Sequence, residues 1–291
     1  MIRTITLCLH GIRAIVLCAT PCAAAEPAKE TAPESESAYL RRIYREEAEK
    51  HVFYHDADRR QPLELIDHPI MRWDNEGTWS GDVFVWTHKG RPEVIGCMLS
   101  GPRGDNLRYV YDEFHLVADQ PISPAVLQTR QRWQPEHGLA KEPLEGAAKP
   151  AASSAGRLTQ MRRLTREITA HMQADKPWEL RLLPQPVFRY QAEESGVMDG
   201  ALFVYVWGIG TDPELILLLE CRRNGAEVAW HYAPIRFSNR ALWLKRDGRE
   251  IWRVDAHREP AGTTSAIYTT AFARSIPRYE PQRQTRPANS E

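Results

Sequence analysis

Two long apolar runs, at residues 201–207 and 215–219, constrain the fold of this chain more than any other feature. The residues between them include four that favour turns: Gly208, Gly210, Asp212 and Pro213. Apolar runs of this length bounded by turn residues indicate strands that are buried on both faces. The sequence therefore predicts a β-hairpin with one layer of structure on each side.

A similar sequence occurs earlier in the chain, at residues 81–99. Other segments of the first half also resemble segments of the second half, and they occur in the same order. Three of these matches are 40–46 (LRRIYRE) with 161–167 (MRRLTRE), 69–73 with 186–190, and 92–95 with 213–216. The spacing changes only between elements, where small loop insertions cost little free energy. The repeated order predicts an internal duplication.

Each predicted copy starts with an amphipathic helix, at residues 38–52 and 157–172, and continues with strand candidates. A helix followed by antiparallel strands is typical of an α+β layer. We therefore expect an α+β fold of two tandem related copies, each one helix plus an antiparallel β-meander, packed about a pseudo-twofold axis. Cystatin-like and nuclear-transport-factor-like folds have this order of elements, an analogy that carries no function.

The expected divisions of the chain follow from composition and periodicity. They are a signal peptide (1–25), a spacer (26–37), copy one (38–135), an Ala/Pro/Gly-rich linker (136–156), copy two (157–256) and a polar, largely disordered tail (257–291).

The N-terminus has the features of a targeting segment. Arg3 precedes a broken apolar region, and Ala23, Ala24 and Ala25 form a small-residue cleavage site. No apolar run reaches the roughly 20 residues that a membrane span requires. The sequence predicts export to the periplasm or the cell exterior, with no transmembrane segment in the mature chain.

The charge balance bears on the possible partners, and the cysteine content bears on disulfide bonds. The chain has 38 basic and 38 acidic residues and a formal net charge of zero, which gives no electrostatic reason to bind nucleic acid. The expected partner is an unknown ligand or an envelope protein. After signal removal only Cys97 and Cys221 remain, and two buried free thiols are favoured over a disulfide.

Three segments of the second half resemble a family of uncharacterised exported proteins of planctomycete-type bacteria. They are 179–190 (ELRLLPQPVFRY), 199–208 (DGALFVYVWG) and 212–220 (DPELILLLE), and the first half is similar through GDVFVWTHKGRPEV and YDEFH. The resemblance covers most of the mature chain. It implies export and a two-part layout, and it brings no known activity, cofactor or catalytic residue.

Tyr111, Glu113 and His115 form the most suggestive cluster of polar residues. Alternate residues of a strand point to one face, so these three side chains would form a row. His beside a carboxylate suits an acid/base pair or half of a metal site. The alternative is the polar outer face of a half-exposed strand.

Two equivalent pairs, Arg72 with Trp73 and Arg189 with Tyr190, are candidate ligand-binding residues. An arginine beside an aromatic ring could hold a ligand carboxylate. The alternative is a cross-strand ion pair in each half, Arg72 with Glu93 and Arg189 with Glu214. Recurrence in both halves favours the ion pairs.

No motif in the sequence indicates a metal site, a cofactor or a nucleophile elbow, so we expect no metal and no cofactor. The sequence favours an exported, non-catalytic protein that binds a partner or ligand or supports the cell envelope. The alternative is an exported hydrolase with Glu113 and His115 as its acid/base pair. A hydrolase would need these side chains to converge in a pocket.

Overall fold

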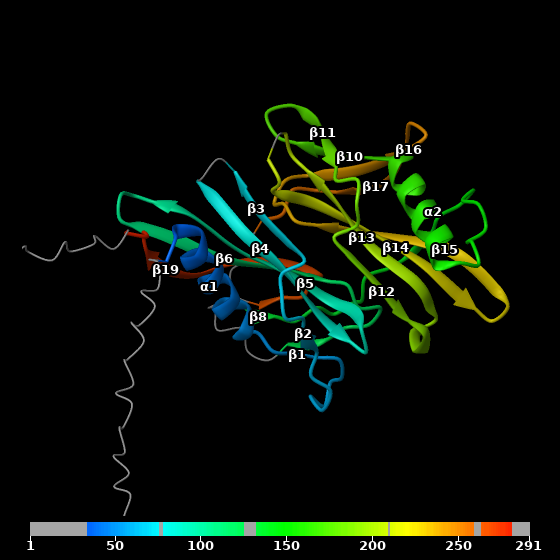
Figure 1. Cartoon of the computed structure of the whole chain (residues 1–291), viewed down its shortest axis with the longest axis horizontal. Coiled ribbons are helices and arrows are strands. Elements are labelled where there is room, and N and C mark those ends of the chain that lie inside the picture. Colours follow the sequence, from blue (N-terminus) through cyan, green and yellow to red (C-terminus); the bar gives the residue numbers. More distant parts are fainter. Residues whose placement is uncertain (1–33, 76–77, 125–131, 209, 259–262, 281–291) are drawn as a thin grey trace, which may run out of the picture. The chain divides into compact units, whose positions relative to one another are not determined.

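The computed structural model describes residues 34–75, 78–124, 132–208, 210–258 and 263–280 (Figure 1). The predicted signal peptide, residues 1–25, and most of the predicted spacer lie outside this range.

The described elements follow one another in two halves. The first contains α1 (Glu36–Glu49), β1 (Phe53–Tyr54), β2 (Glu64–Leu65), β3 (Met71–Asn75), β4 (Trp79–His88), β5 (Arg91–Arg103) and β6 (Leu107–Leu116). The short strands β7 (Ser123–Pro124), β8 (Arg132–Trp133) and β9 (Glu142–Pro143) lead to α2 (Ser154–Arg166). The second half contains β10 (Ile168–Gln173), β11 (Pro177–Leu182), β12 (Phe188–Ala192), the 3₁₀ turn η1 (Glu193–Ser195), β13 (Val197–Val206), β14 (Pro213–Asn224), β15 (Glu227–Arg236), β16 (Leu242–Arg246) and β17 (Arg249–Val254). The last described strands are β18 (Thr263–Thr264) and β19 (Tyr268–Pro277).

The long strands form two half-barrel antiparallel sheets. The six-stranded sheet has the order β19-β6-β5-β4-β2, with β3 also paired to β4. The nine-stranded sheet has the order β17-β16-β10-β11-β13-β14-β15-β9, with β12 also paired to β13. The predicted hairpin of the second half is β13–β14, and its counterpart in the first half is β4–β5.

The two helices are amphipathic, and each begins at a serine cap. Ser35 accepts a hydrogen bond from the backbone of Ala38 and Ser153 accepts one from Gly156, which satisfies N–H groups that lack a partner within the helix. The buried residues of α1 recur every three or four positions: Leu40, Ile43, Tyr44, Glu47 and Ala48. In Figure 1, α1 lies against β4 and β5, and α2 lies against β13 and β14.

Alternation along the central strands divides the core into three clusters. Val83 and Val85 of β4 face Val204 and Val206 of β13 in a cluster shared by both sheets. The intervening residues point the other way: Phe84 and Trp86 pack with α1, and Phe203 and Tyr205 pack with α2. Each hairpin is therefore covered by a helix on one face and by the opposite sheet on the other, as its apolar runs require.

The predicted α+β class is wrong, because the chain is mostly β and the described residues contain only two α-helices. The two copies of helix plus meander, packed about a pseudo-twofold axis, are wrong as well. The sheets have different strand numbers, and each takes strands from outside its predicted copy. A common origin of the two halves stays a prediction.

Three segments differ from the sequence prediction in their local structure. Residues 168–173 form β10 rather than the end of a helix, because they pair with β11 and β16. The predicted linker contains β9, which pairs with β15. The predicted tail contains β19, which pairs with β6 from Leu107 to His115. Pairing between segments far apart in sequence leaves no signal in local periodicity.

Two smaller expectations can be compared directly with the structure. Cys97 and Cys221 are free and buried, which agrees with the favoured interpretation. Among the described residues, no helix is both long enough and apolar enough to cross a membrane.

Because β19 completes the first sheet, we expect its buried side chains to stabilise the fold. Ile276 is 2% exposed and packs in the cluster beneath α1, whereas Phe272 on the same strand is 45% exposed. Ile276→Ala should lower the free energy of unfolding by about 2–4 kcal/mol. Phe272→Ala, the control, should lower it by less than about 1 kcal/mol. Urea denaturation measures both values, and equal small effects would show that β19 is not part of the folded core.

Candidate functional site

A cavity of about 510 Å³ opens where the two sheets meet, and we call it the intersheet cleft. Its lining comes from both sheets and from the β15–β16 loop. The aromatic and charged residues of the lining are Trp79, Tyr111, Glu113, Trp207, Asp212, Glu214, Arg240 and Tyr268. Aromatic rings and carboxyl groups therefore face the same space.

Strand β6 supplies two residues of the cleft through its alternation. Tyr111 and Glu113 point to the same face and both line the cavity. Strand β19 lies beside β6 and places Tyr268 near them. The Tyr268 hydroxyl donates a short hydrogen bond to Glu113 Oε1, which fixes the carboxyl group at the cavity wall.

The second sheet supplies the other acidic groups of the cleft. Asp212 precedes β14 and Glu214 is the second residue of that strand. Pro213 between them starts the strand, so the chain turns at this point and both acids remain near the edge of the shared core. The sequence interpretation treated Asp212 as a turn residue and Glu214 as the ion-pair partner of Arg189, so it did not identify either acid as part of a site.

The cleft favours protonated carboxyl groups. Burial raises the pKa of Glu113 to about 7. Burial, Glu214 and Glu113 together raise the pKa of Asp212 to about 8, and burial also raises the pKa of Glu214. A carboxyl group that is neutral near pH 7 can both donate and accept a hydrogen bond.

Arg236 places a buried cation beside these acids without forming an ion pair with them. Its guanidinium donates to the backbone carbonyls of Ser238, Asp255 and Arg240 and lies over the Tyr268 ring at 5.0 Å. Burial lowers the pKa of Arg236. Arg236 therefore fixes the β15–β16 loop and the Tyr268 ring, which both form walls of the cleft.

His115 lies on the same face of β6 as Glu113 but does not line the cleft. Its side chain is buried, and its Nδ1 bonds to the carbonyl oxygen of Leu116 at 2.7 Å. Burial lowers the pKa of His115 to about 3. Tyr111 and Glu113 thus line the same cavity, whereas the His115 side chain is buried outside it. A catalytic role for these residues stays a prediction.

The structure separates the four candidate ligand-binding residues. Arg72 and Trp73 line a cavity of about 670 Å³ beside α1. Arg189 is bound to Asp199 and Ser154, and Tyr190 is buried with its hydroxyl donating to Glu220 Oε1 at 2.6 Å. Within the described chain, only the first pair lines one of the larger cavities described here.

The ion pairs predicted for Arg72 and Arg189 have different partners in the structure. Arg72 pairs with Asp82 at 3.5 Å, and Arg189 pairs with Asp199 at 2.7 Å. The reason is strand order: β3 and β12 lie beside β4 and β13, whereas the predicted partners Glu93 and Glu214 lie one strand further away. The prediction identified the arginines and assigned the wrong acids.

One group of side chains in the described residues has the spacing of metal ligands. It consists of Glu47, His51 and Asp112, whose candidate ligand atoms all lie within 4.8 Å of one another. None of the three belongs to the intersheet cleft. No sequence motif marks this group, because Asp112 lies far from Glu47 and His51 along the chain.

Comparison with known proteins gives no family for the chain. No protein-family model, curated protein or solved structure matches it.

The raised pKa of Glu113 predicts a specific dependence of stability on pH. Its pKa in the fold is about 7, against 4.5 as the ordinary value, so between these pH values the native state binds more protons than the unfolded chain. The contribution of Glu113 to the free energy of unfolding is fully present below pH 4.5 and is lost as pH rises through 7, a change of roughly 3 kcal/mol.

Glu113→Gln removes this titration, so its free energy of unfolding should rise relative to that of the unmodified protein as pH increases from 4.5 to 8. Urea denaturation across this range measures the difference. The side chain of Glu46 is 45% exposed, so Glu46→Gln is the control. Its free energy of unfolding should not rise relative to that of the unmodified protein over this pH range. Parallel curves for Glu113→Gln and the unmodified protein would contradict a raised pKa.

Proposed function

We propose that this protein is an exported, non-catalytic binding protein that holds a small hydroxylated ligand of the saccharide type in the intersheet cleft. The observation that carries the proposal is the lining of the cleft, where aromatic rings stand beside carboxyl groups of raised pKa. Export rests on the predicted signal peptide and on the resemblance to exported proteins.

The aromatic rings of the cleft supply apolar faces against which a ligand ring can pack. Trp207 is 37% exposed, so part of its ring is accessible to a ligand. The guanidinium carbon of Arg240 lies 5.4 Å from the centroid of the Trp207 ring. The ring centroids of Trp79 and Tyr111 are 6.0 Å apart. The C–H faces of a sugar ring pack on such surfaces, while its hydroxyl groups require hydrogen-bonding partners nearby.

The carboxyl groups provide those hydrogen-bonding partners. Near pH 7, Glu113 and Asp212 can donate as well as accept, because burial has raised the pKa of both groups. A ligand hydroxyl needs both kinds of partner. A cationic ligand would instead require ionised carboxylates, and the raised pKa values work against that state at neutral pH.

A hydrolase remains the second candidate, favoured by one observation. Glu113 has a pKa of about 7 and faces a cavity that also contains Asp212 and Glu214, and a carboxyl group tuned in this way suits general acid catalysis. His115 lies outside that cavity, so its part in such a reaction would be indirect.

The proposal is tested by titrating the protein with oligosaccharides of glucose and of N-acetylglucosamine, and with spermidine as a cationic probe. Isothermal titration calorimetry measures the dissociation constant of each. We expect at least one saccharide to bind, and Trp207→Ala to weaken that binding about tenfold, which corresponds to loss of one aromatic contact. Tyr39→Ala is the control, since Tyr39 is a partly exposed aromatic residue of α1 outside the cleft lining, and it should leave the affinity unchanged.

Three results would contradict the proposal. If no saccharide binds, the proposed ligand class is wrong, and if the Trp207→Ala and Tyr39→Ala variants bind with equal affinity, the cleft is not the binding site. Release of shorter saccharides during the titration, lost in Glu113→Gln, would favour the hydrolase.

A further inference from the structure

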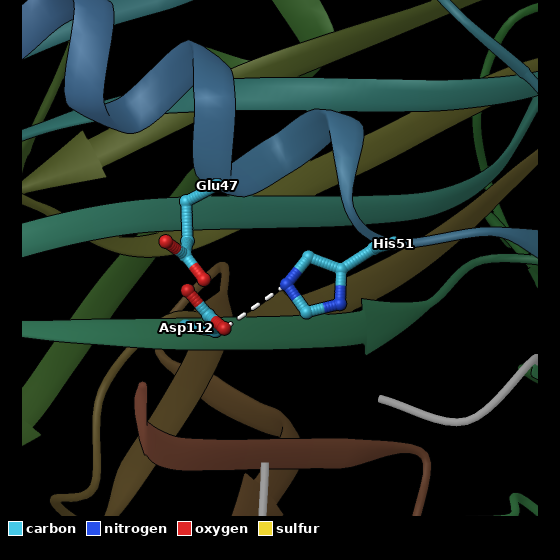
Figure 2. A group of neighbouring side chains, drawn as sticks. All are labelled: Glu47, His51 and Asp112. Atoms are coloured by element: carbon cyan, nitrogen blue, oxygen red, sulfur yellow. Dashed lines mark hydrogen bonds and ion pairs between the residues drawn. The ribbon is translucent and has the colours of Figure 1, made fainter. Parts of the chain in front are cut away.

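Glu47, His51 and Asp112 lie together where the end of α1 meets β6 (Figure 2). Glu47 belongs to the last turn of α1, His51 follows the helix, and Asp112 lies in β6. His51 Nε2 lies 3.0 Å from Asp112 Oδ2. The helix end and the strand thus bring one imidazole and two carboxylates to a common point.

This group, which we call the α1–β6 triad, is deeply buried and only partly satisfied. The side chains of Glu47, His51 and Asp112 are 6%, 1% and 1% exposed. Asp112 Oδ1 and His51 Nδ1 are buried and have no hydrogen-bond partner. A buried polar atom without a partner costs free energy, so an unpaired carboxylate oxygen calls for a bound proton or cation.

The orientation of the two carboxylates points to the position of that cation. In Figure 2 one oxygen of Asp112 is directed to His51, and the other is directed towards the carboxylate of Glu47. Two carboxylates that face each other in a buried site repel unless a positive charge lies between them.

The surroundings hold the three side chains in place. Lys50 and Arg274 both donate to the same oxygen of Glu47, Oε2, at 2.8 Å, and these contacts leave Oε1 outside both pairs. The His51 ring packs edge-on against Phe114, with centroids 4.7 Å apart. Outer contacts of this kind fix the direction of metal ligands in known metal sites.

We propose that Glu47, His51 and Asp112 bind one divalent transition-metal ion of the zinc type, which joins the end of α1 to β6. One imidazole nitrogen and two carboxylate oxygens are ligands that Zn²⁺ accepts. The ion would occupy the space between the two facing carboxylates and would satisfy Asp112 Oδ1. Asp112 points away from the cleft side of β6, since it alternates with Tyr111 and Glu113, so this site is independent of saccharide binding.

The test uses the full chain after treatment with EDTA and removal of the chelator. Equilibrium dialysis against Zn²⁺ measures the number of ions bound, and thermal unfolding measures the change in Tm. We expect one Zn²⁺ to bind at this site and Tm to rise by about 5 °C when free Zn²⁺ is about 100 times the dissociation constant. Mg²⁺ keeps its water and prefers an octahedral shell of oxygen atoms, so it should leave Tm unchanged.

Variants assign the bound ion to the triad rather than to other histidines or cysteines of the chain. Asp112→Asn and Glu47→Gln should each bind one Zn²⁺ fewer than the unmodified protein and lose the rise in Tm. Glu46 lies on the same turn of α1 and its side chain is exposed. The Glu46→Gln variant is therefore the control and should behave like the unmodified protein. If Asp112→Asn does not fold, Glu47→Gln decides the question, because the basic partners that it leaves, Lys50 and Arg274, are 32% and 35% exposed and can be solvated by water.

The proposal is overturned if Zn²⁺ leaves Tm unchanged, or if Glu47→Gln binds as many ions as the Glu46→Gln control. Either result would mean that the protein's own groups, a bound proton or the cations of Lys50 and Arg274, balance the two carboxylates without a metal ion.

Discussion

Arg91 and Glu220 form an ion pair at the junction of the two sheets, with side chains that are 6% and 0% exposed. Removing two charges from water is costly, and such a pair persists only when further hydrogen bonds satisfy it. Tyr190 donates to the same Glu220 oxygen, and Asp119 accepts from Arg91 at 3.0 Å. These contacts join β5 to β14 and fix how the apolar faces of the two sheets meet. The cavities and the acidic groups at the margins of that contact depend on the same alignment.

Several carboxyl groups with raised pKa values lie at the margins of the shared core. Glu113 and Asp212 line the intersheet cleft, and Glu93 lines a third cavity, of about 590 Å³, beside Arg91. Burial raises the pKa of Glu93 to about 7, much as it does for Glu113. The apolar centre has no room for charge, and solvent would return each carboxyl group to its ordinary pKa. The boundary between these regions is where a carboxyl group can change its charge near neutral pH.

Local features of the chain were predictable from sequence, and long-range pairing was not. The apolar runs identified β13 and β14, and the period of Leu40, Ile43 and Tyr44 identified α1, because burial imposes its own spacing on the residues of an element. The partner of β6 could not be found in this way. Strand β19 contains Arg274 and Ser275. Its polar sequence is typical of a disordered tail, and only its pairing with β6 identifies it as a strand. The same limit explains the wrong acids assigned to Arg72 and Arg189, since only strand order shows which carboxylate is nearer.

The position of β19 has a consequence for how the chain acquires its structure. Strand β6 cannot complete its outer ladder until β19 arrives, and the whole second half of the chain lies between the two strands. Until then β6 presents a row of unpaired N–H and C=O groups, which are a template for pairing with other chains. Contacts over such sequence separations form slowly, because closing a long loop costs chain entropy before the contact forms. The first sheet can therefore be completed only after the second half has been synthesised, although its other strands precede that half in the chain, and the first half alone lacks one of its strands.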